Sequence, residues 1–358
     1  MKILILANND VGLYQFRGEL ILTLLKQHQV TISLPYGPLV EPLKEAGCKF
    51  VDTPIDRRGI NPATDLKLLA QYKKLLKAEQ PDLVITYTIK PNIYGSMACK
   101  SLNIPYAVNI TGLGTAFQGS GMLRKLVTIL YTTALKKAKT VFFENSANRQ
   151  LFVDEGIVPA EKTCLLPGAG VNLQRYTPAP YPEDGKIHFL FVGRVMKEKG
   201  IGELFEAMDR LTADGANCCL DVLGLHEEDM DEQIRKGQEA GWLNYHGYQA
   251  DVRPFIEKAH CFVLPSYHEG MANTNLECSA MARPLITSDI PGCREAVTPD
   301  SGILCKPQDV DSLFSAMERF LRLPQSQKAT MGTAARHHME AVFDKAKVVQ
   351  TTLNALEV

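Results

Sequence analysis

The sequence predicts an α/β protein with two parallel-sheet domains, and three observations support this prediction. With 358 residues, the chain is too long for one ordinary hydrophobic core and suits two domains of about 170 residues each. Short runs of β-branched and aliphatic residues alternate with segments of helical periodicity, which is the pattern of βαβ units. A segment with three prolines, Tyr176–Gly185, divides this series in two and is typical of a linker.

The first half of the chain contains six candidate strands with helical segments between them. The strands are Lys2–Ala7, Val30–Leu34, Phe50–Asp52, Leu83–Tyr87, Tyr106–Asn109 and Thr140–Glu144. The clearest helices are Leu13–Gln27, Asp65–Ala78 and Leu123–Lys137. Because a polar loop and then a helix follow the first strand, we expect that loop at the carboxyl edge of the sheet, where such folds bind ligands.

A second series of candidate strands follows the linker. They are His188–Val192, Cys219–Leu223, Cys261–Leu264, Leu285–Thr287 and Gly302–Cys305. We therefore expect two Rossmann-like domains, residues 1–180 and residues 186–337, which face each other across a cleft. The final helical stretch, about residues 338–358, is expected to pack back onto the first domain.

Composition places the protein among soluble globular proteins, with 45% hydrophobic and 22% charged residues. The nine cysteines form no CxxC pair, which favours reduced thiols in the cytoplasm. The apolar run Ile3–Ala7 is too short for a signal peptide, and the sequence shows no stretch of about 20 apolar residues that could span a bilayer.

Charge is distributed unevenly along the chain. Residues 1–180 carry a formal charge of +8 and the remainder carries −9. Two explanations stay open: the halves attract each other, or the basic half faces an anionic membrane surface or a phosphorylated acceptor. The basic segment 122–139 has apolar residues at positions 123, 126, 127, 130 and 134, which fit both a core-facing stripe and a helix lying on lipid.

A first candidate site follows the strand His188–Val192. Gly193 and Arg194 come directly after this strand, and Lys199 precedes the next helix. A glycine lets backbone approach a ligand, a guanidinium grips phosphate oxygens in bidentate fashion, and an ammonium adds a second positive charge. These residues are suited to a diphosphate, although a charged strand-to-helix turn has the same composition.

A second candidate site follows the strand Cys261–Leu264. Glu269 and Glu277, with seven residues between them, flank the start of a predicted helix. Glu277 forms a capping-box pattern with Thr274, in which the acid would only close the helix start. Glu269 has no such local explanation. The helix N-terminus between them favours an anion.

Together the two segments resemble glycosyltransferase family 4. The run Phe-Val-Gly-Arg-x-x-x-Glu-Lys-Gly, followed about 70 residues later by the two glutamates, carries the resemblance, which extends over essentially the whole chain. It implies the GT-B fold and retention of anomeric configuration. It also implies that Arg194 and Lys199 bind the diphosphate of a UDP-sugar, Glu277 the ribose, and Glu269 the transferred sugar, with no metal ion or other cofactor required. Further donor contacts are implied for Gly12, Gly193, Tyr248, Val252, Gly270, Met271, Asn273 and Thr274.

Two further motifs, Thr86–Gly95 and Asn109–Gly114, are similar to the bacterial subgroup that extends sugars on polyprenyl diphosphate. This likeness implies transfer of a hexose or N-acetylhexosamine to a polyprenyl-diphosphate-linked saccharide in glycan, capsule or O-antigen assembly, at the inner face of the membrane. Lys90, Asn92 and Thr111 are the candidate acceptor-side residues, and loop capping is the other explanation for Lys90. Other members carry a histidine near the position of Thr111, which this chain lacks.

Several other signals point away from competing functions. The DxD strings 229–231 and 309–311 stand at helix starts and the histidines lack ligand spacing, so we expect no metal site. The absence of GxGxxG after a strand argues against a dinucleotide oxidoreductase, and nucleic acid is not expected as a partner. Two alternatives remain: a UDP-sugar epimerase of the same fold, and a non-catalytic nucleotide-sugar-binding assembly protein.

Overall fold

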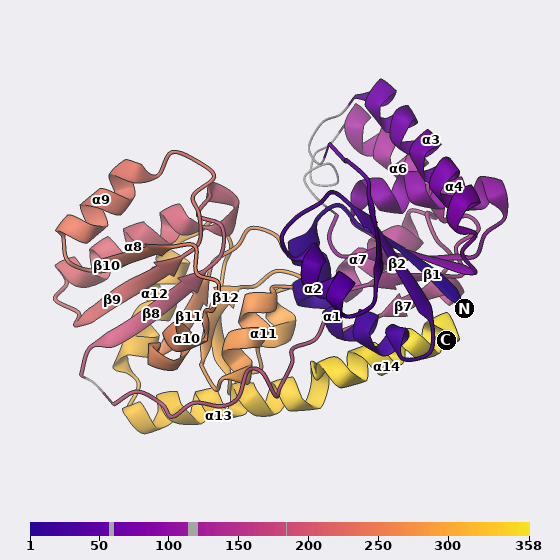
Figure 1. Cartoon of the computed structure of the whole chain (residues 1–358). Coiled ribbons are helices and arrows are strands. Elements are labelled where there is room, and N and C mark those ends of the chain that lie inside the picture. Colours follow the sequence, from indigo (N-terminus) through magenta and orange to yellow (C-terminus); the bar gives the residue numbers. More distant parts are fainter. Residues whose placement is uncertain (57–60, 114–120, 184) are drawn as a thin grey trace. The chain divides into compact units, whose positions relative to one another are not determined.

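The computed structural model describes residues 1–56, 61–113, 121–183 and 185–358. Contacts within the chain divide it into two compact units. Unit 1 comprises Met1–Ala169 together with Lys347–Val358, and unit 2 comprises Gly170–Ala346. Each unit has its own sheet with helices packed around it (Figure 1).

The sheet of unit 1 has seven parallel strands in the order β3-β2-β1-β4-β5-β6-β7. Their bounds are β1 Lys2–Leu6, β2 Gln29–Leu34, β3 Lys49–Asp52, β4 Leu83–Tyr87, β5 Tyr106–Ile110, β6 Thr140–Phe143 and β7 Thr163–Leu165. Every residue of β4 and β5 is buried, as expected for central strands covered on both faces. The six predicted strands are therefore confirmed, and β7 was not predicted.

Unit 1 surrounds this sheet with helices. They are α1 Asp10–Leu25, α2 Val40–Glu45, α3 Pro62–Glu79, the π-helix η1 Pro91–Gly95, α4 Ser96–Leu102, α6 Met122–Leu135, α7 Ser146–Asp154, the 3₁₀ helix η2 Ala160–Lys162 and α14 Lys345–Leu356. The C-terminal helix α14 contributes Leu353 and Leu356 to the core of unit 1, and Lys139 Nζ donates to the Leu356 carbonyl at 2.9 Å.

The helix α6 buries only some of its apolar residues. It buries Val127, Tyr131, Ala134 and Leu135, a stripe with the spacing of one helix face. Leu126, one of the apolar residues that fit both explanations of this segment, is 48% exposed. The hydrophobic residues of this helix occupy more than one face, so sequence periodicity alone did not select the buried one.

The sheet of unit 2 has six parallel strands in the order β10-β9-β8-β11-β12-β13. Their bounds are β8 Ile187–Val192, β9 Cys218–Leu223, β10 Leu243–Gly247, β11 Cys261–Leu264, β12 Leu285–Ser288 and β13 Gly302–Cys305. The helices are η3 Lys197–Lys199, α8 Ile201–Ala213, α9 Asp231–Glu239, α10 Arg253–Lys258, α11 Asn273–Ala280, η4 Arg294–Ala296, α12 Val310–Arg322 and α13 Gln325–Val342. The five predicted strands are confirmed, whereas β10 was missed.

The predicted linker Tyr176–Gly185 lies within unit 2 and, apart from residue 184 outside the described part, is packed against it. The buried Arg283 side chain donates to the carbonyls of Ala179 and Pro180 at 3.0 and 2.8 Å. The Tyr181 hydroxyl donates to the His260 carbonyl at 2.9 Å. Prolines keep this segment extended, and its carbonyls are bound by donors from the body of the unit.

Both sheets have a topological switch point, where the strand order reverses. It lies between β1 and β4 in unit 1 and between β8 and β11 in unit 2. In open α/β sheets, ligands bind outside the carboxyl ends of the strands that flank this point. The loops that follow β1, β4, β8 and β11 are therefore the places to look for a site. No helix among the described residues is both long and apolar enough to cross a membrane.

Candidate functional site

The switch point of unit 2 brings two of the predicted charged residues together. Lys199, at the end of the loop after β8, forms an ion pair with Glu269, in the loop after β11. Ser266 Oγ donates to the same Glu269 Oε1 at 2.8 Å. The side chains of Lys199 and Glu269 are only 19% and 13% exposed. A shielded cation and a hydrogen-bonded carboxylate thus lie beside one another at the edge where a ligand is expected.

Close backbone packing fixes the loops after β8 and β11 relative to each other. The Tyr267 N–H donates to the Glu198 carbonyl at 3.0 Å. Gly200 has φ +71°, and a Cβ atom there would lie 2.1 Å from the Pro265 carbonyl oxygen. Only glycine fits this close approach without displacing backbone. The contact holds Lys199 next to Glu269.

A third loop supports the opposite side of the Glu269 turn. A Cβ atom at Gly292 would lie 2.7 Å from the carbonyl oxygens of both Glu269 and Gly270. The Ala272 N–H donates to the Gly292 carbonyl at 2.8 Å. The turn is therefore held between the β8 and β12 loops, which gives α11 a fixed starting point.

Among the described residues, no side chain caps the N-terminus of α11. Its N-cap residue is Ala272, and Asn273 and Thr274 are the first two helical residues. The predicted capping box of Thr274 and Glu277 is therefore wrong, because Thr274 already lies inside the helix. Unpaired amides at a helix start favour an anion. The buried Oδ1 atom of Asn273 has no hydrogen-bond partner in the described part of the chain.

Glu277 lies on α11 and interacts with residues distant in sequence. The Tyr176 hydroxyl hydrogen-bonds its carboxylate, and Arg175 and Lys345 contribute positive charge. Burial nevertheless dominates and raises the pKa of Glu277 to about 7. A desolvated carboxylate of this kind gains from hydrogen-bond donors such as ribose hydroxyls.

This raised pKa predicts a pH effect on stability. The folded carboxyl has a pKa of about 7 against an ordinary 4.5, so the folded state binds the proton more tightly than the unfolded state. The free energy of unfolding should therefore fall as the pH rises through this interval. Glu277→Gln should lack this loss, and urea denaturation of both proteins at pH 5 and pH 8 measures it. Equal pH dependence in the two proteins would contradict the assignment.

Arg194 forms an ion pair with a different carboxylate from that of Lys199. Its Nη1 is 3.0 Å from Glu227 Oε2, on the loop after β9, and its side chain is 52% exposed. Gly193 continues the strand, since its N–H donates to the Leu223 carbonyl at 2.9 Å. An exposed ion pair contributes only about 1 kcal/mol or less, so a phosphate could compete for Arg194.

The predicted base-binding residues follow β10. Tyr248 comes directly after this strand and is 62% exposed, whereas Val252 packs partly against the core of unit 2. β10 is two strands from β8, or about 10 Å at the usual strand spacing. Met271, beside the Glu269 turn, is buried, so only its backbone is suited to a donor contact.

At the switch point of unit 1, two predicted site residues, Gly12 and Asn92, form hydrogen bonds within the protein. The Gly12 N–H binds Asn9 Oδ1 at 2.6 Å, so the start of α1 is capped by its own side chain. Asn92 is buried: its Oδ1 accepts from Thr86 Oγ1 and its Nδ2 donates to the Asn109 carbonyl, both at 2.8 Å. The Asn92 amide therefore joins η1 to β4 and β5, and the prediction that it lies on the acceptor side stays a prediction.

Lys90 and Thr111 follow the neighbouring strands β4 and β5. Lys90 Nζ is 2.8 Å from Asp65 Oδ1, and the Tyr94 hydroxyl donates to the other oxygen of Asp65 at 2.9 Å. Thr111 is partly buried directly after β5. Gly114, the last residue of the second acceptor-side motif, lies outside the described residues.

Two features at the carboxyl edge of the unit 1 sheet, a strained residue and a buried ion pair, were not predicted from the sequence. Thr88 has φ +72°, a costly conformation for a β-branched residue, and such strain clusters at functional sites. Arg17 and Glu144 form a buried ion pair, with the guanidinium 5.0 Å from the centre of the Tyr87 ring. Glu144 ended a predicted strand, but its partner is 127 residues away, beyond any local signal.

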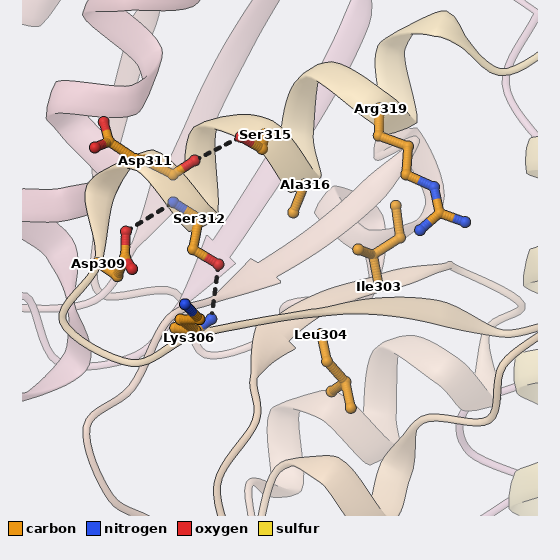
Figure 2. A pocket seen from close by; sticks show the side chains of 9 residues that line it. All are labelled: Ile303, Leu304, Lys306, Asp309, Asp311, Ser312, Ser315, Ala316 and Arg319. Carbon is orange, nitrogen blue, oxygen red and sulfur yellow. Dashed lines mark hydrogen bonds between the residues drawn. The ribbon is translucent and has the colours of Figure 1, made fainter.

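A surface hollow of about 510 Å³ lies elsewhere in unit 2, between the edge strand β13 and α12 (Figure 2). Several of its polar groups are hydrogen-bonded or ion-paired. Asp309 caps α12 at the Ser312 N–H, and Ser312 Oγ accepts from the Lys306 N–H. Asp311 pairs with Arg210. The hollow is remote in sequence from the switch-point loops, and we assign it no function.

Comparisons with known proteins agree with this geometry. Residues 186–322 match the family described as "Glycosyl transferases group 1", and residues 2–145 match "Glycosyl transferase 4-like". The chain is 26% identical to an N,N'-diacetylbacillosaminyl-diphospho-undecaprenol α-1,3-N-acetylgalactosaminyltransferase of Campylobacter jejuni, covering 99% of this chain and 97% of that protein. It is 28% identical to a UDP-Gal:α-D-GlcNAc-diphosphoundecaprenol α-1,3-galactosyltransferase of Escherichia coli, covering 83% and 81%.

Solved structures show the same fold. HepE of Anabaena, in complex with UDP and glucose, superposes with a TM-score of 0.81 at 17% identity, covering 100% of this chain and 99% of that one. A glycosyltransferase from Rickettsia africae gives 0.79 at 18% identity, covering 99% and 97%.

The fold and the matched families define a glycosyltransferase of the GT-B type, with a parallel sheet in each of two units. More particularly, the chain belongs to the group 1, family-4-like glycosyltransferases that its two halves match. The resemblance predicted from the sequence is confirmed.

Proposed function

We propose that this enzyme transfers a hexose or N-acetylhexosamine, with retention, from a UDP-sugar to a polyprenyl-diphosphate-linked saccharide in bacterial glycan assembly. The observation that carries the proposal is the Lys199–Glu269 pair beside the uncapped start of α11, at the switch point of unit 2. The names of the two relatives, both of which specify an undecaprenol diphosphate acceptor, support the acceptor class. The HepE complex with UDP supports the donor class.

The chemistry assigned to the donor side is electrostatic. As the sugar–phosphate bond breaks, negative charge grows on the departing diphosphate, and preorganised cations and amides stabilise it. In our proposal the Lys199 ammonium and the first amides of α11 supply this stabilisation, and Arg194 leaves Glu227 to join them. The Glu269 carboxylate pairs with Lys199 and accepts a hydrogen bond from a hydroxyl of the sugar.

Retention is explained by attack on the face from which the diphosphate leaves. The acceptor oxygen forms the new bond to the sugar as the old bond breaks. Its proton passes to an oxygen of the departing diphosphate, so that charge and atoms balance without a covalent enzyme intermediate. Neither step requires a metal ion, and Glu277 holds the ribose during both.

Membrane contact is proposed through α6 of unit 1. Met122, Leu126 and Ile129 are 87%, 48% and 62% exposed and lie at spacings of one helix face. The exposed Lys125 adds positive charge to the same helix, whereas Arg124 forms an ion pair with Glu155. Apolar side chains flanked by cations suit an anionic lipid surface such as the inner face of the cell membrane, where polyprenyl diphosphates are anchored.

Vesicle binding tests this helix. The double variant Leu126→Glu/Ile129→Glu should bind phosphatidylglycerol vesicles at least about tenfold more weakly, because each buried side chain contributes about 1.5–3 kcal/mol. Leu22→Glu is the matched control, since Leu22 is also 48% exposed but lies on α1. Co-sedimentation measures the effect. Equal losses in the two proteins would indicate that α6 is not the contact.

A donor screen tests the reaction. UDP-sugars are offered with polyprenyl-diphosphate-linked acceptors in the presence of EDTA, and we expect transfer of one sugar with its configuration retained. Sugar conversion without acceptor would indicate the epimerase, and nucleotide-sugar binding without turnover would indicate the assembly protein. Neither alternative is favoured by an observation in the structure. Loss of transfer on adding EDTA, in a protein that circular dichroism shows to remain folded, would overturn the metal-independent chemistry.

A further inference from the structure

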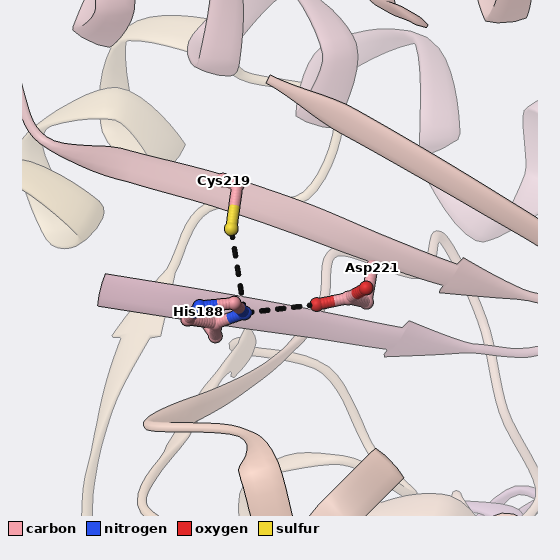
Figure 3. A group of neighbouring side chains, drawn as sticks. All are labelled: His188, Cys219 and Asp221. Atoms are coloured by element: carbon pink, nitrogen blue, oxygen red, sulfur yellow. Dashed lines mark hydrogen bonds and ion pairs between the residues drawn. The ribbon is translucent and has the colours of Figure 1, made fainter. Parts of the chain in front are cut away.

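Three potential metal ligands meet on the sheet of unit 2, away from the donor site. They are His188 of β8 and Cys219 and Asp221 of β9, and all their ligand atoms lie within 4.8 Å of one another (Figure 3). His188 Nδ1 is 3.3 Å from Asp221 Oδ2 and 3.4 Å from Cys219 Sγ. Both neighbours therefore converge on a single imidazole nitrogen.

The two separations from His188 Nδ1 match edges of a tetrahedral zinc site, and Cys219 Sγ and the Asp221 carboxylate lie within 4.8 Å of each other. With Zn–N and Zn–O bonds of about 2.0–2.2 Å and a Zn–S bond of about 2.3 Å, tetrahedral angles place N and O about 3.3 Å apart and N and S about 3.5 Å apart. One imidazole N–H can point well at only one of the two acceptors. A cation placed among the three atoms would satisfy both contacts.

The surroundings hold the carboxylate in the orientation that a ligand needs. His246 Nε2 lies 2.8 Å from Asp221 Oδ1, and Asn244 Nδ2 donates to the same oxygen at 3.2 Å. Asp221 therefore presents its other oxygen to His188. Carboxylates and imidazoles at metal sites are commonly oriented by such outer hydrogen bonds. Cys219 is buried, whereas the His188 side chain is 28% exposed, which leaves a route for an ion and a water.

We propose that His188, Cys219 and Asp221 bind one divalent transition-metal ion, for which Zn²⁺ is the best fit, with water as the fourth ligand. The set of imidazole, thiolate and carboxylate is one that Zn²⁺ accepts and Mg²⁺ does not. His188 lies five residues before Gly193, roughly 16 Å along the strand from the donor loop. The ion stabilises unit 2 and takes no part in sugar transfer, so this inference is independent of the proposed function.

Metal binding at this cluster must displace protons. The forms that bind a metal ion are the thiolate and the neutral imidazole. Affinity should therefore rise with pH.

Cobalt is the probe, because Co²⁺ occupies zinc sites and gives a near-ultraviolet charge-transfer band when a thiolate binds it. The full-length protein, freed of metal by a chelator, should bind one Co²⁺ with this band, and Zn²⁺ should displace it. Calorimetry in buffers of different ionisation enthalpy should show the proton release. Zn²⁺ should also raise the melting temperature.

Matched variants locate the site. Cys219→Ala and His188→Gln should abolish the band, and His246→Gln should weaken Co²⁺ binding by about 10- to 100-fold. Cys218→Ala is the control, because adjacent strand residues face opposite sides of the sheet and Cys218 belongs to the hydrophobic core. Circular dichroism verifies that each variant is folded.

Two outcomes would overturn the proposal. Absence of the thiolate band in the wild-type protein would mean that the three residues form a hydrogen-bonded cluster only. A band that survives in folded Cys219→Ala or His188→Gln would place the cobalt at another thiol.

Discussion

Lys199→Ala is expected to lower turnover by about 10²–10³-fold, the cost of removing one preorganised group that stabilises developing charge. The variant removes the ammonium that we assign to the leaving diphosphate. It also leaves Glu269 with the Ser266 hydroxyl as its one remaining side-chain hydrogen bond among those described. The rate constant for transfer at saturating UDP-sugar measures the effect, and the Michaelis constant of the donor should change less than the rate.

Lys197 provides the matched control for this experiment. It lies in the same short 3₁₀ turn and has the same charge, but it is exposed, and only its backbone N–H is hydrogen-bonded to Glu228, at 2.9 Å. Lys197→Ala should keep turnover within a few-fold of the wild type. If Lys199→Ala behaved like Lys197→Ala, the role of Lys199 at the leaving group would have to be abandoned.

Gly200→Ala is expected to damage both folding stability and activity. The left-handed conformation at φ +71° costs an L-residue roughly 1–2 kcal/mol. The added Cβ would also meet the Pro265 carbonyl oxygen at 2.1 Å, so one of the two loops must move. Because those loops carry Lys199 and Glu269, we expect a lower free energy of unfolding together with a turnover loss of at least tenfold.

The neighbouring Gly202 separates this effect from an ordinary glycine substitution. It lies in α8, and a Cβ atom there would meet nothing within 4 Å. Gly202→Ala should raise stability by about 0.5–1 kcal/mol, because alanine is favoured within a helix. Urea denaturation and turnover are compared for the two variants. A Gly200→Ala protein as stable and active as Gly202→Ala would show that the close approach of the loops is unimportant.

The strand pattern was predictable from the sequence because most strands are buried runs. β4 and β11 are entirely buried, and their hydrophobic residues are continuous in the sequence. β7 has only three residues, and the sequence of β10 is Leu-Asn-Tyr-His-Gly. Neither strand therefore contains a long continuous run of hydrophobic residues. Both are edge strands, where tertiary pairing rather than composition decides the structure.

The candidate site was predictable only in part. The resemblance to a family placed Lys199 and Glu269 together although 70 residues separate them. The capping-box prediction failed because contact of Ala272 with Gly292 sets the start of α11, which local sequence does not encode. Likewise, the partners of Glu277 and the Arg194–Glu227 pair come from distant loops. The cluster of His188, Cys219 and Asp221 escaped notice because its ligands come from two strands and show no motif spacing.

The most direct test of the central claim is a crystal structure of the protein with bound UDP. We expect the pyrophosphate between Lys199 Nζ and the first amides of α11, with Arg194 turned from Glu227 towards the phosphates and Glu277 bound to the ribose. A pyrophosphate bound elsewhere, with Lys199 and Arg194 still in their present ion pairs, would contradict the account.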